Sequence, residues 1–159
     1  MQPIIVRPAT AQDLEALNRF QQAIVTAERS FDATIKDGPV SYYDIARMLA
    51  SDKVRFVVAT AGADLVGCGY ARIDVAEHYL KHAAQAYLGL MYVKPRYRGQ
   101  SVNRKIIEAL KHWCRSAQVT EMRLEVYHDN IAAIRAYEKS GFRRLLIEMR
   151  LDLTDDDGR

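Results

Sequence analysis

The chain has 159 residues, a length that suits one domain able to bury about two-thirds of the surface of its unfolded state. Hydrophobic residues make up 49% of it and charged residues 27%, which is ordinary for a globular protein and excludes collagen-like, disordered and disulfide-scaffold classes. The 23 basic and 20 acidic residues give a net charge of +3, which is too small to indicate nucleic-acid binding by itself.

The compartment is predicted from the start of the chain, its apolar runs and its cysteines. The first residues lack a basic region followed by a long apolar core, and no apolar run approaches the ~20 residues of a membrane span. Cys68 and Cys114 are far apart and lie among apolar residues, which favours two buried thiols over a disulfide. The sequence therefore predicts a cytoplasmic protein with no membrane partner.

The first third of the chain predicts a strand followed by two helices. A β-branched run is ended by Pro8, and Thr10 stands three residues before Asp13 as a helix cap. In chain order we expect a strand at 4–9, a helix through 14–25, a polar loop at 28–39 and a short helix capped by Ser41 and Asp44.

Two antiparallel strands are predicted next, at 54–60 and 65–75. Gly67 and Gly69 interrupt the second strand and indicate a bulge or a close backbone approach there. The connection at 77–84 is ambiguous, and the one regular element that its sequence fits is a turn of helix.

The remaining chain predicts alternating strands and helices. The run 86–93 is apolar throughout, as in a strand buried on both faces. We then expect a helix with Val102, Ile106, Leu110 and Trp113 on one side, a strand at 122–127, a helix from Asn130 closed by Gly141, and one or two strands in 142–153. The prediction is one α/β domain over 1–153 with a mixed sheet, followed by a polar tail at 154–159.

The passage from the strand at 86–93 into the next helix has the pattern of an anion site. The first N–H groups of a helix lack intrahelical partners and carry the positive end of its dipole. Gly99 removes a Cβ that would hinder close approach, Gln100, Ser101 and Val102 offer N–H groups in series, and Arg98 adds charge. The spacing matches neither a Walker A loop nor a Rossmann fingerprint. Alone, the segment fits a solvated turn equally well.

A second motif follows and carries a family resemblance. Asn130, Ala133, Tyr137 and Gly141-Phe142 lie on a strand–helix–turn unit, with Asn130 and Tyr137 two helical turns apart. Together with Arg96-x-x-Gly99-x-Ser101, this pattern resembles the GCN5-related N-acetyltransferase (GNAT) superfamily. The detailed match covers 86–142, and the order of elements fits from residue 3 onward.

The resemblance implies a single-domain GNAT-like fold: a mixed, mostly antiparallel sheet with a splayed central strand pair, flanked by helices. Acetyl-CoA would lie between the strands at 88–93 and 122–127. Its pantetheine arm would pair with the backbone at Met91 and Val93, and Asn130 would contact it, cap its helix, or do both. The pyrophosphate would bind the N–H groups of Arg98, Gly99, Gln100, Ser101, Val102 and Asn103. Ser101 and Asn103 depart from the family's usual small residues, although a serine keeps its N–H.

The activity that the resemblance implies is direct transfer of an acetyl group to the amine of a small molecule or peptide. A backbone N–H near Met91 would stabilise the oxyanion, and Tyr137 would be the general acid, although a buried aromatic is its alternative reading. Many relatives carry a glutamate on the strand before the turn, but 85–93 contains no carboxylate. The base is therefore open among a water relay, Tyr87, Tyr92, Glu125, His128, Glu28 and Asp32. The acids of the loops, Glu28, Asp32, Asp37 and Glu77, suggest a cationic amine.

Three alternatives remain beside this reading. The missing strand glutamate keeps open a non-catalytic CoA-binding module that regulates a protein partner. A nucleic-acid binder is disfavoured because net charge is low and aromatic residues do not alternate with the basic ones. His78 and His82 are four residues apart, but no third ligand is suitably spaced, so no metal is expected. A homodimer, the acceptor's identity and the use of other acyl groups are left open.

Overall fold

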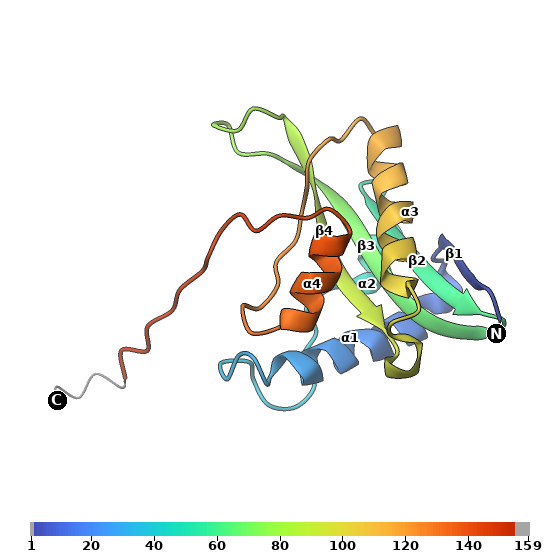
Figure 1. Ribbon diagram of the computed structural model, residues 1–159, viewed down its shortest axis with the longest axis horizontal. Coiled ribbons are helices and arrows are strands. Elements are labelled where there is room, and N and C mark those ends of the chain that lie inside the picture. The colour runs from blue at the N-terminus through green and yellow to red at the C-terminus, as the bar shows by residue number, and fades with distance from the viewer. Residues whose placement is uncertain (1, 155–159) are drawn as a thin grey trace.

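The computed structural model describes residues 2–154, which form a five-stranded sheet with helices on both of its faces (Figure 1). The strands are β1 (Ile4–Pro8), β2 (Val54–Ala61), β3 (Asp64–Val75), β4 (Ala84–Val93) and β5 (Met122–Arg123). The helices are α1 (Leu14–Glu28), α2 (Ile45–Leu49), α3 (Val102–Ser116) and α4 (Ile131–Lys139), with short 3-10 turns η1 (Ala11–Asp13) and η2 (Pro95–Tyr97). Among these residues every helix is too short or too polar to cross a bilayer.

The sheet is mixed and mostly antiparallel, as predicted. Its strands follow the order β1-β2-β3-β4-β5, and only the β4–β5 pair is parallel. A parallel pair requires a crossover, which α3 provides between β4 and β5. The long apolar run predicted to be a buried strand is β4, at the centre of the structure.

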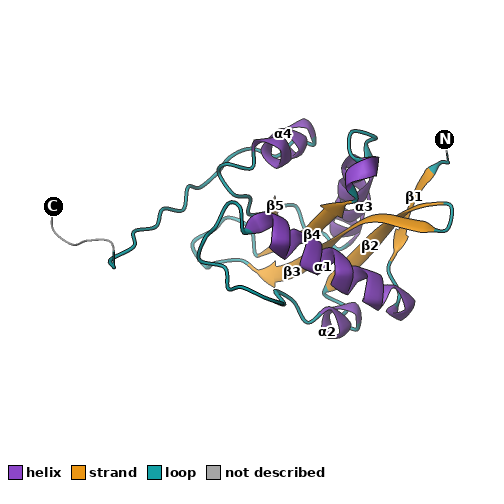
Figure 2. Cartoon of the chain, turned by 90° about the horizontal axis from the view of Figure 1, so that it is seen from below, coloured by secondary structure: helices purple, strands orange, loops and turns teal. Residues whose placement is uncertain are grey.

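Helices lie on both faces of the sheet (Figure 2), and each face has its own apolar core. One face is covered by α3, through Val102, Ile106 and Leu110, and Phe142, which follows α4, packs against the same core. Leu17 and Phe20 of α1 and the short helix α2 cover the other face. Cys68 and Cys114 are buried free thiols, which confirms the expectation that they do not pair.

Three predictions about local structure are wrong. The cap of α2 is Asp44, whose carboxylate accepts the N–H of Arg47 at 3.1 Å, and not Ser41. The strand predicted at 122–127 has only its first two residues in the ladder, and none of 142–153 is a strand. Alternating side chains make a segment suitable for a sheet, but a strand forms only where a neighbouring strand accepts its hydrogen bonds.

The connection between β3 and β4 is irregular and contains no helix. Of the predicted polar tail at 154–159, residues 155–159 lie outside the described part of the chain.

Candidate active site

Strands β4 and β5 separate after two residue pairs. Ala86 pairs with Met122 and Tyr87 with Arg123, after which β5 ends while β4 continues to Val93. Lys94 N–H donates to Val66 C=O of β3 at 2.8 Å. Because backbone groups alternate sides along an antiparallel strand, the amide of Val93 faces away from β3, toward the opening that β5 has left. The splayed strand pair expected from the resemblance is therefore present.

A β-bulge changes the direction of the backbone in the middle of β4. Leu90 has a φ of 49°, and the pairing moves from Tyr70–Gly89 to Cys68–Tyr92, which leaves two residues of β4 opposite Gly69. A Cβ on Gly69 would lie 2.5 Å from the Met91 sulfur. The expected bulge is thus confirmed, and it gives the backbone at Met91 a direction that a regular strand would not have.

The turn before α3 presents unpaired N–H groups. Gly99 and Ser101 both have left-handed backbones, with φ of 75° and 61°. The first bond inside the helix runs from Lys105 N–H to Ser101 C=O at 3.1 Å, so the amides of residues 102–104 have no partner within the helix. A Cβ on Gly99 would meet nothing within 4 Å, so its backbone conformation, rather than packing, favours glycine there. This geometry suits a bound phosphate.

The basic residues before the turn are occupied with structural contacts. Asp64 accepts from Lys94 Nζ at 2.6 Å, from the Arg96 guanidinium and from the Tyr97 hydroxyl at 3.2 Å. Hydrogen bonds from Lys94 and Arg96 lower the pKa of Asp64 to about 2. Lys94 and Arg96 therefore anchor the turn to β3.

Arg98 is also tied to the protein. Its N–H donates to Pro95 C=O at 3.2 Å, and its Nε donates to Val93 C=O at 3.1 Å. Of the amides predicted to hold a phosphate, that of Arg98 is therefore already bonded, whereas its remaining guanidinium nitrogens keep their donors.

Helix α4 begins at Asn130 and carries Tyr137 two turns later. Asn130 Oδ1 accepts the N–H of Ala133 at 3.2 Å, so its predicted capping role is confirmed. The Tyr137 ring packs against Phe142, with centroids 5.9 Å apart. Burial, with a smaller contribution from the negative charge of Glu28, raises the pKa of Tyr137 to about 12. Tyr137 thus remains a protonated phenol at neutral pH.

The carboxylate of Glu28 lies at the end of α1, in a cluster of aromatic and acidic side chains. Burial raises the pKa of Glu28, a hydrogen bond from the Tyr42 hydroxyl opposes this, and the charge of Asp32 adds to it. Asp32 accepts from the Tyr127 hydroxyl at 3.2 Å, and Phe31 stacks on Tyr127 with centroids 5.9 Å apart. Segments from three distant parts of the sequence therefore meet here: the end of α1 with its following loop, the chain after β5, and α4.

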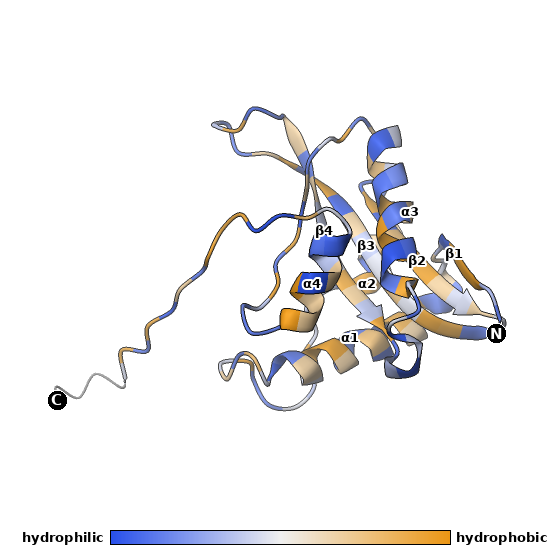
Figure 3. Cartoon of the chain, in the orientation of Figure 1, coloured by the Kyte–Doolittle hydropathy of each residue, from blue (hydrophilic) through white to orange (hydrophobic). Residues whose placement is uncertain are grey.

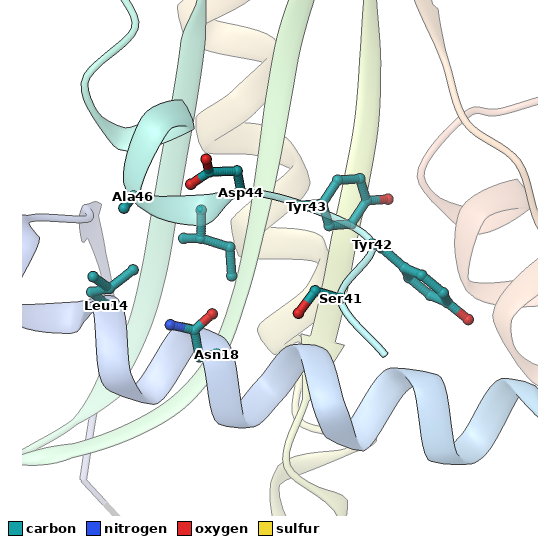
Figure 4. A pocket seen from close by; sticks show the side chains of 8 residues that line it. Leu14, Asn18, Ser41, Tyr42, Tyr43, Asp44 and Ala46 are labelled. Atoms are coloured by element: carbon teal, nitrogen blue, oxygen red, sulfur yellow. The ribbon is translucent and has the colours of Figure 1, made fainter. Parts of the chain in front are cut away.

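Gln21 fixes the loop that carries Tyr42. Its side chain is buried, and its Oε1 accepts the N–H groups of Tyr42 and Tyr43 at 2.9 and 2.8 Å. The Tyr42 side chain points away from Leu14 and Asn18, which line a depression between α1 and α2 (Figure 4). Gln21 was not among the residues predicted from the sequence to have a role. A polar residue on the apolar face of α1 was the available signal, because a buried amide needs partners.

The other candidates for the base have different surroundings. Burial raises the pKa of Tyr87, and the Arg72 guanidinium lies over its ring at 5.2 Å. Tyr92 packs against Phe20 in the core beneath α1, with centroids 4.8 Å apart. Glu125 and His128 are exposed. Only Glu28 combines partial burial, a raised pKa and an electrostatic influence on Tyr137.

The two histidines that raised the question of a metal lie in the β3–β4 connection. His82 Nε2 is 2.9 Å from Gln85 Oε1, and the His78 ring packs edge-on against Tyr79. Within residues 2–154 no group of three or more His, Cys, Asp or Glu side chains is placed to hold a metal ion.

Comparisons with known proteins agree on one family. The sequence model of the acetyltransferase (GNAT) family matches residues 20–142. An IAA acetyltransferase of Azospirillum brasilense is 26% identical over 137 residues, which are 86% of this chain and 78% of that protein.

Solved structures share the fold. A predicted acetyltransferase of Clostridium acetobutylicum, determined with acetyl-CoA, has a TM-score of 0.72 at 16% identity over 98% of this chain and 99% of its own. The aminoglycoside N-acetyltransferase AAC(6')-Iy, in complex with CoA, has a TM-score of 0.76 at 18% identity over 96% and 95% of the two chains. At such identities the likeness concerns the fold alone.

Proposed function

The chain belongs to the GNAT family of acetyltransferases, and we propose that it acetylates a cationic primary amine by direct attack, with Tyr137 as general acid and Glu28 as general base. Membership makes it an N-acetyltransferase whose acyl donor is acetyl-CoA. The observation that carries the proposal is the cluster at the end of α1, where half-buried Glu28 lies beside Asp32, Tyr127 and Phe31. Glu28 is also close enough to Tyr137 of α4 for its negative charge to raise the pKa of that phenol.

The surroundings of the turn fit the donor. A diphosphate on the amides of residues 99–103 would accept several N–H bonds and meet the positive end of the α3 dipole. The first turn of α3 contains no acidic residue to repel it. The outward amide of Val93 and the bulged backbone at Met91 supply donors and acceptors for an amide-bearing arm beside β4.

Glu28 and Tyr137 suit opposite proton transfers. A carboxylate with a raised pKa is a better base near neutral pH than an ordinary one, so Glu28 takes a proton from the ammonium form of the acceptor. The nitrogen then forms its bond to the acyl carbon to give a tetrahedral oxyanion, and the carbon–sulfur bond breaks when this intermediate collapses. Tyr137 gives its proton to the departing thiolate. The nitrogen loses its second proton after the bond has formed, and this proton restores the Tyr137 hydroxyl. In total the ammonium loses two protons, one through Glu28 to solvent and one to Tyr137, and the thiolate gains one, so each turnover releases one proton.

A cationic acceptor is supported by the composition of the same cluster. Glu28 and Asp32 supply negative charge, while Tyr42, Tyr127 and Phe31 supply aromatic surface beside them. Carboxylates and aromatic faces both attract ammonium groups. The IAA and aminoglycoside acetyltransferases act on different acceptors, so family membership leaves the acceptor open.

The test is incubation with acetyl-CoA and a panel of amines, with thiol release as the readout. Diamines and aminosugars are expected to react faster than monoamines of the same size that carry no further charged group. Tight CoA binding without thiol release from any amine would refute the transferase proposal and support a non-catalytic CoA-binding module. Faster reaction of acceptors that carry a carboxylate would refute the cationic-acceptor part alone.

A further inference from the structure

Tyr70 carries a buried hydroxyl without a hydrogen-bond partner. The residue lies in the middle of β3, and its Oη is the one buried side-chain nitrogen or oxygen of residues 2–154 that bonds to no protein group. Its surroundings are apolar, since Phe56, Val58 and Leu90 belong to the same core and the central strands are predominantly hydrophobic (Figure 3). A phenol without a partner in such a place lowers stability, so its presence needs an explanation.

The position of this hydroxyl is set by the neighbouring strand. Tyr70 pairs with Gly89 of β4, and a Cβ at Gly89 would lie 2.5 Å from Tyr70 Oη. The ring therefore reaches across to β4, where only a glycine leaves room for it. Gly89 comes two residues after Tyr87, the last residue of β4 that pairs with β5, and directly before the bulge at Leu90. The hydroxyl thus lies where β4 borders the opening that β5 has left.

Two further tyrosines surround the hydroxyl. Tyr43 stands edge-on to the Tyr70 ring with centroids 5.2 Å apart, and the Tyr87 ring lies at 6.4 Å. Burial and then the nearby Tyr43 hydroxyl raise the pKa of both Tyr70 and Tyr87, so both remain protonated donors at neutral pH. Tyr43 and Tyr87 are only partly buried, so a ligand can reach them, whereas it can reach Tyr70 only through them.

The hydrogen-bonding capacity of phenols determines what kind of atom completes this group. Each phenol has one proton to donate. If Tyr70 donates to Tyr43, the proton of Tyr43 must be directed outward, to a lone pair that a ligand supplies. An ammonium group has no lone pair, so the ligand must bring a second polar group with an acceptor atom.

The charges beside the tyrosines favour an uncharged acceptor atom. The Arg72 guanidinium, which lies over the Tyr87 ring, already donates to Asp74 at 2.8 and 3.0 Å. The negative charge of exposed Glu125 also acts on Tyr87. A carboxylate would therefore meet a neutralised cation and a like charge, while a hydroxyl or carbonyl oxygen meets neither difficulty.

We propose that Tyr43 binds an uncharged oxygen of the acceptor, either a hydroxyl or a carbonyl, and that Tyr70 positions Tyr43 by donating to its hydroxyl. The inference rests on the proposed function and narrows its acceptor to an amine that also carries such an oxygen.

Gln21 links the two ends of this acceptor. Its Oε1 holds the N–H groups of both Tyr42 and Tyr43, whose ring centroids are 6.1 Å apart. Both side chains point away from Asn18 (Figure 4). Tyr42 meets Glu28 at the amine end, while Tyr43 meets the oxygen, so the oxygen lies within a few bonds of the reacting nitrogen.

Matched acceptors test the contact with Tyr43. Linear amino alcohols and small amino amides are each compared with the alkylamine in which a methyl group replaces the polar end, by kcat/KM for acetyl transfer and by calorimetric titration of the CoA complex. An advantage of about tenfold or more is expected for one of the two oxygen-bearing series, which also tells a hydroxyl from a carbonyl. Tyr43→Phe should remove most of this advantage, and Tyr79→Phe, at an exposed tyrosine, should keep it.

The outcomes separate this inference from the proposed function. Equal values for oxygen-bearing amines and alkylamines would overturn the inference and leave the transferase proposal intact. If no amine releases thiol, the transferase proposal fails and the titrations still decide: selective binding that depends on Tyr43 supports the inference, and its absence overturns it.

Tyr70→Phe distinguishes positioning from packing. Because the hydroxyl has no partner in the free protein, its loss should leave the midpoint of thermal unfolding unchanged or raised. The advantage of the oxygen-bearing amines should nevertheless fall about fivefold, mainly through KM for the acceptor. A residue that only packs would leave that advantage unaltered. An unaltered advantage, or a lowered midpoint as for an ordinary buried hydrogen bond, would contradict the role of Tyr70.

Discussion

The two ends of the proposed active site are built in different ways. The donor end is made of consecutive backbone: the bulged strand β4, the turn at Gly99 and Ser101, and the start of α3. The acceptor end is made of side chains from distant segments, with Glu28 on α1 and Tyr137 on α4.

This difference explains how the fold can keep CoA as the donor while the acceptor varies. A phosphate site formed by N–H groups depends on chain geometry more than on side chains. A pocket formed by loop side chains changes with every substitution in those loops. Variants at the two ends should therefore fail in different ways, in affinity for CoA at one end and in turnover at the other.

The largest effect is expected at Gly99. In Gly99→Glu a carboxylate would stand where the diphosphate is expected, and its charge should weaken CoA binding by about a hundredfold or more. Calorimetric titration with CoA measures this change. The left-handed backbone alone should cost about 1 kcal/mol of stability.

Gly38→Glu is the matched control for that change. Gly38 has a φ of 76° and, like Gly99, no atom within 4 Å of an added Cβ. It should suffer the same strain while CoA affinity stays unchanged. Equal losses of CoA affinity in both variants would show that the turn is not part of the CoA site.

Tyr137→Phe should reduce kcat strongly while leaving CoA binding nearly intact. A positioned general acid contributes about a hundredfold or more to the rate, and the phenyl ring keeps the packing on Phe142. Steady-state kinetics and CoA titration together measure both quantities. Tyr79→Phe, at an exposed tyrosine of the β3–β4 connection, should change neither. An unaltered kcat in Tyr137→Phe would exclude Tyr137 as the general acid.

Glu28→Gln should lower kcat/KM by about tenfold to a hundredfold, because the base is lost while the shape is kept. In the unaltered enzyme the rate should rise with pH through the raised pKa of Glu28, and the variant should lack this rise. Glu15→Gln, at an exposed position of the same helix, is the control. A variant that keeps the same pH profile would exclude Glu28 as the base.

The same pKa shift has a consequence for stability. Because the folded state binds the Glu28 proton more tightly than the unfolded state, its contribution to stability is complete below the unfolded pKa and is lost as pH rises through the folded pKa. The stability of the unaltered protein relative to Glu28→Gln should therefore fall between acidic and neutral pH. Parallel denaturant titrations of the two proteins measure it, and a constant difference would contradict the shift.

The smallest effect is expected at Asn130. Loss of its cap in Asn130→Ala should lower the unfolding free energy by about 1 kcal/mol. If its amide also contacts the cofactor, as the family resemblance implies, CoA affinity should fall about threefold. Asn130→Ser should restore the cap and the stability but not the affinity. If Asn130→Ser had the stability and the CoA affinity of the unaltered protein, Asn130 would act only as a helix cap.

The donor end could be predicted from the sequence because its elements are contiguous. Strand, glycine turn and amphipathic helix are each recognisable by local pattern, and covalent order places them together. The helices, the first four strands and the bulge near Gly69 were predictable for the same reason.

The rest depends on neighbours that local pattern does not contain. The alternation at 122–127 and 142–153 predicts strands, but ladders require a second strand, and here the chain provides one only for Met122 and Arg123. The choice of Glu28 among the possible bases required its burial and its effect on Tyr137, which arise only when α1 and α4 come together. Nothing in the spacing of these two residues, over a hundred positions apart, could show it.

A crystal structure with CoA and an unreactive diamine tests the central claim most directly. The account predicts the diphosphate on the amides of residues 99–103, the thiol in the opening between β4 and β5 within hydrogen-bonding reach of Tyr137, and the amine beside Glu28. A diphosphate held instead by the side chains of Arg104 and Lys105 on the outer side of α3, or an amine remote from Glu28, would contradict it.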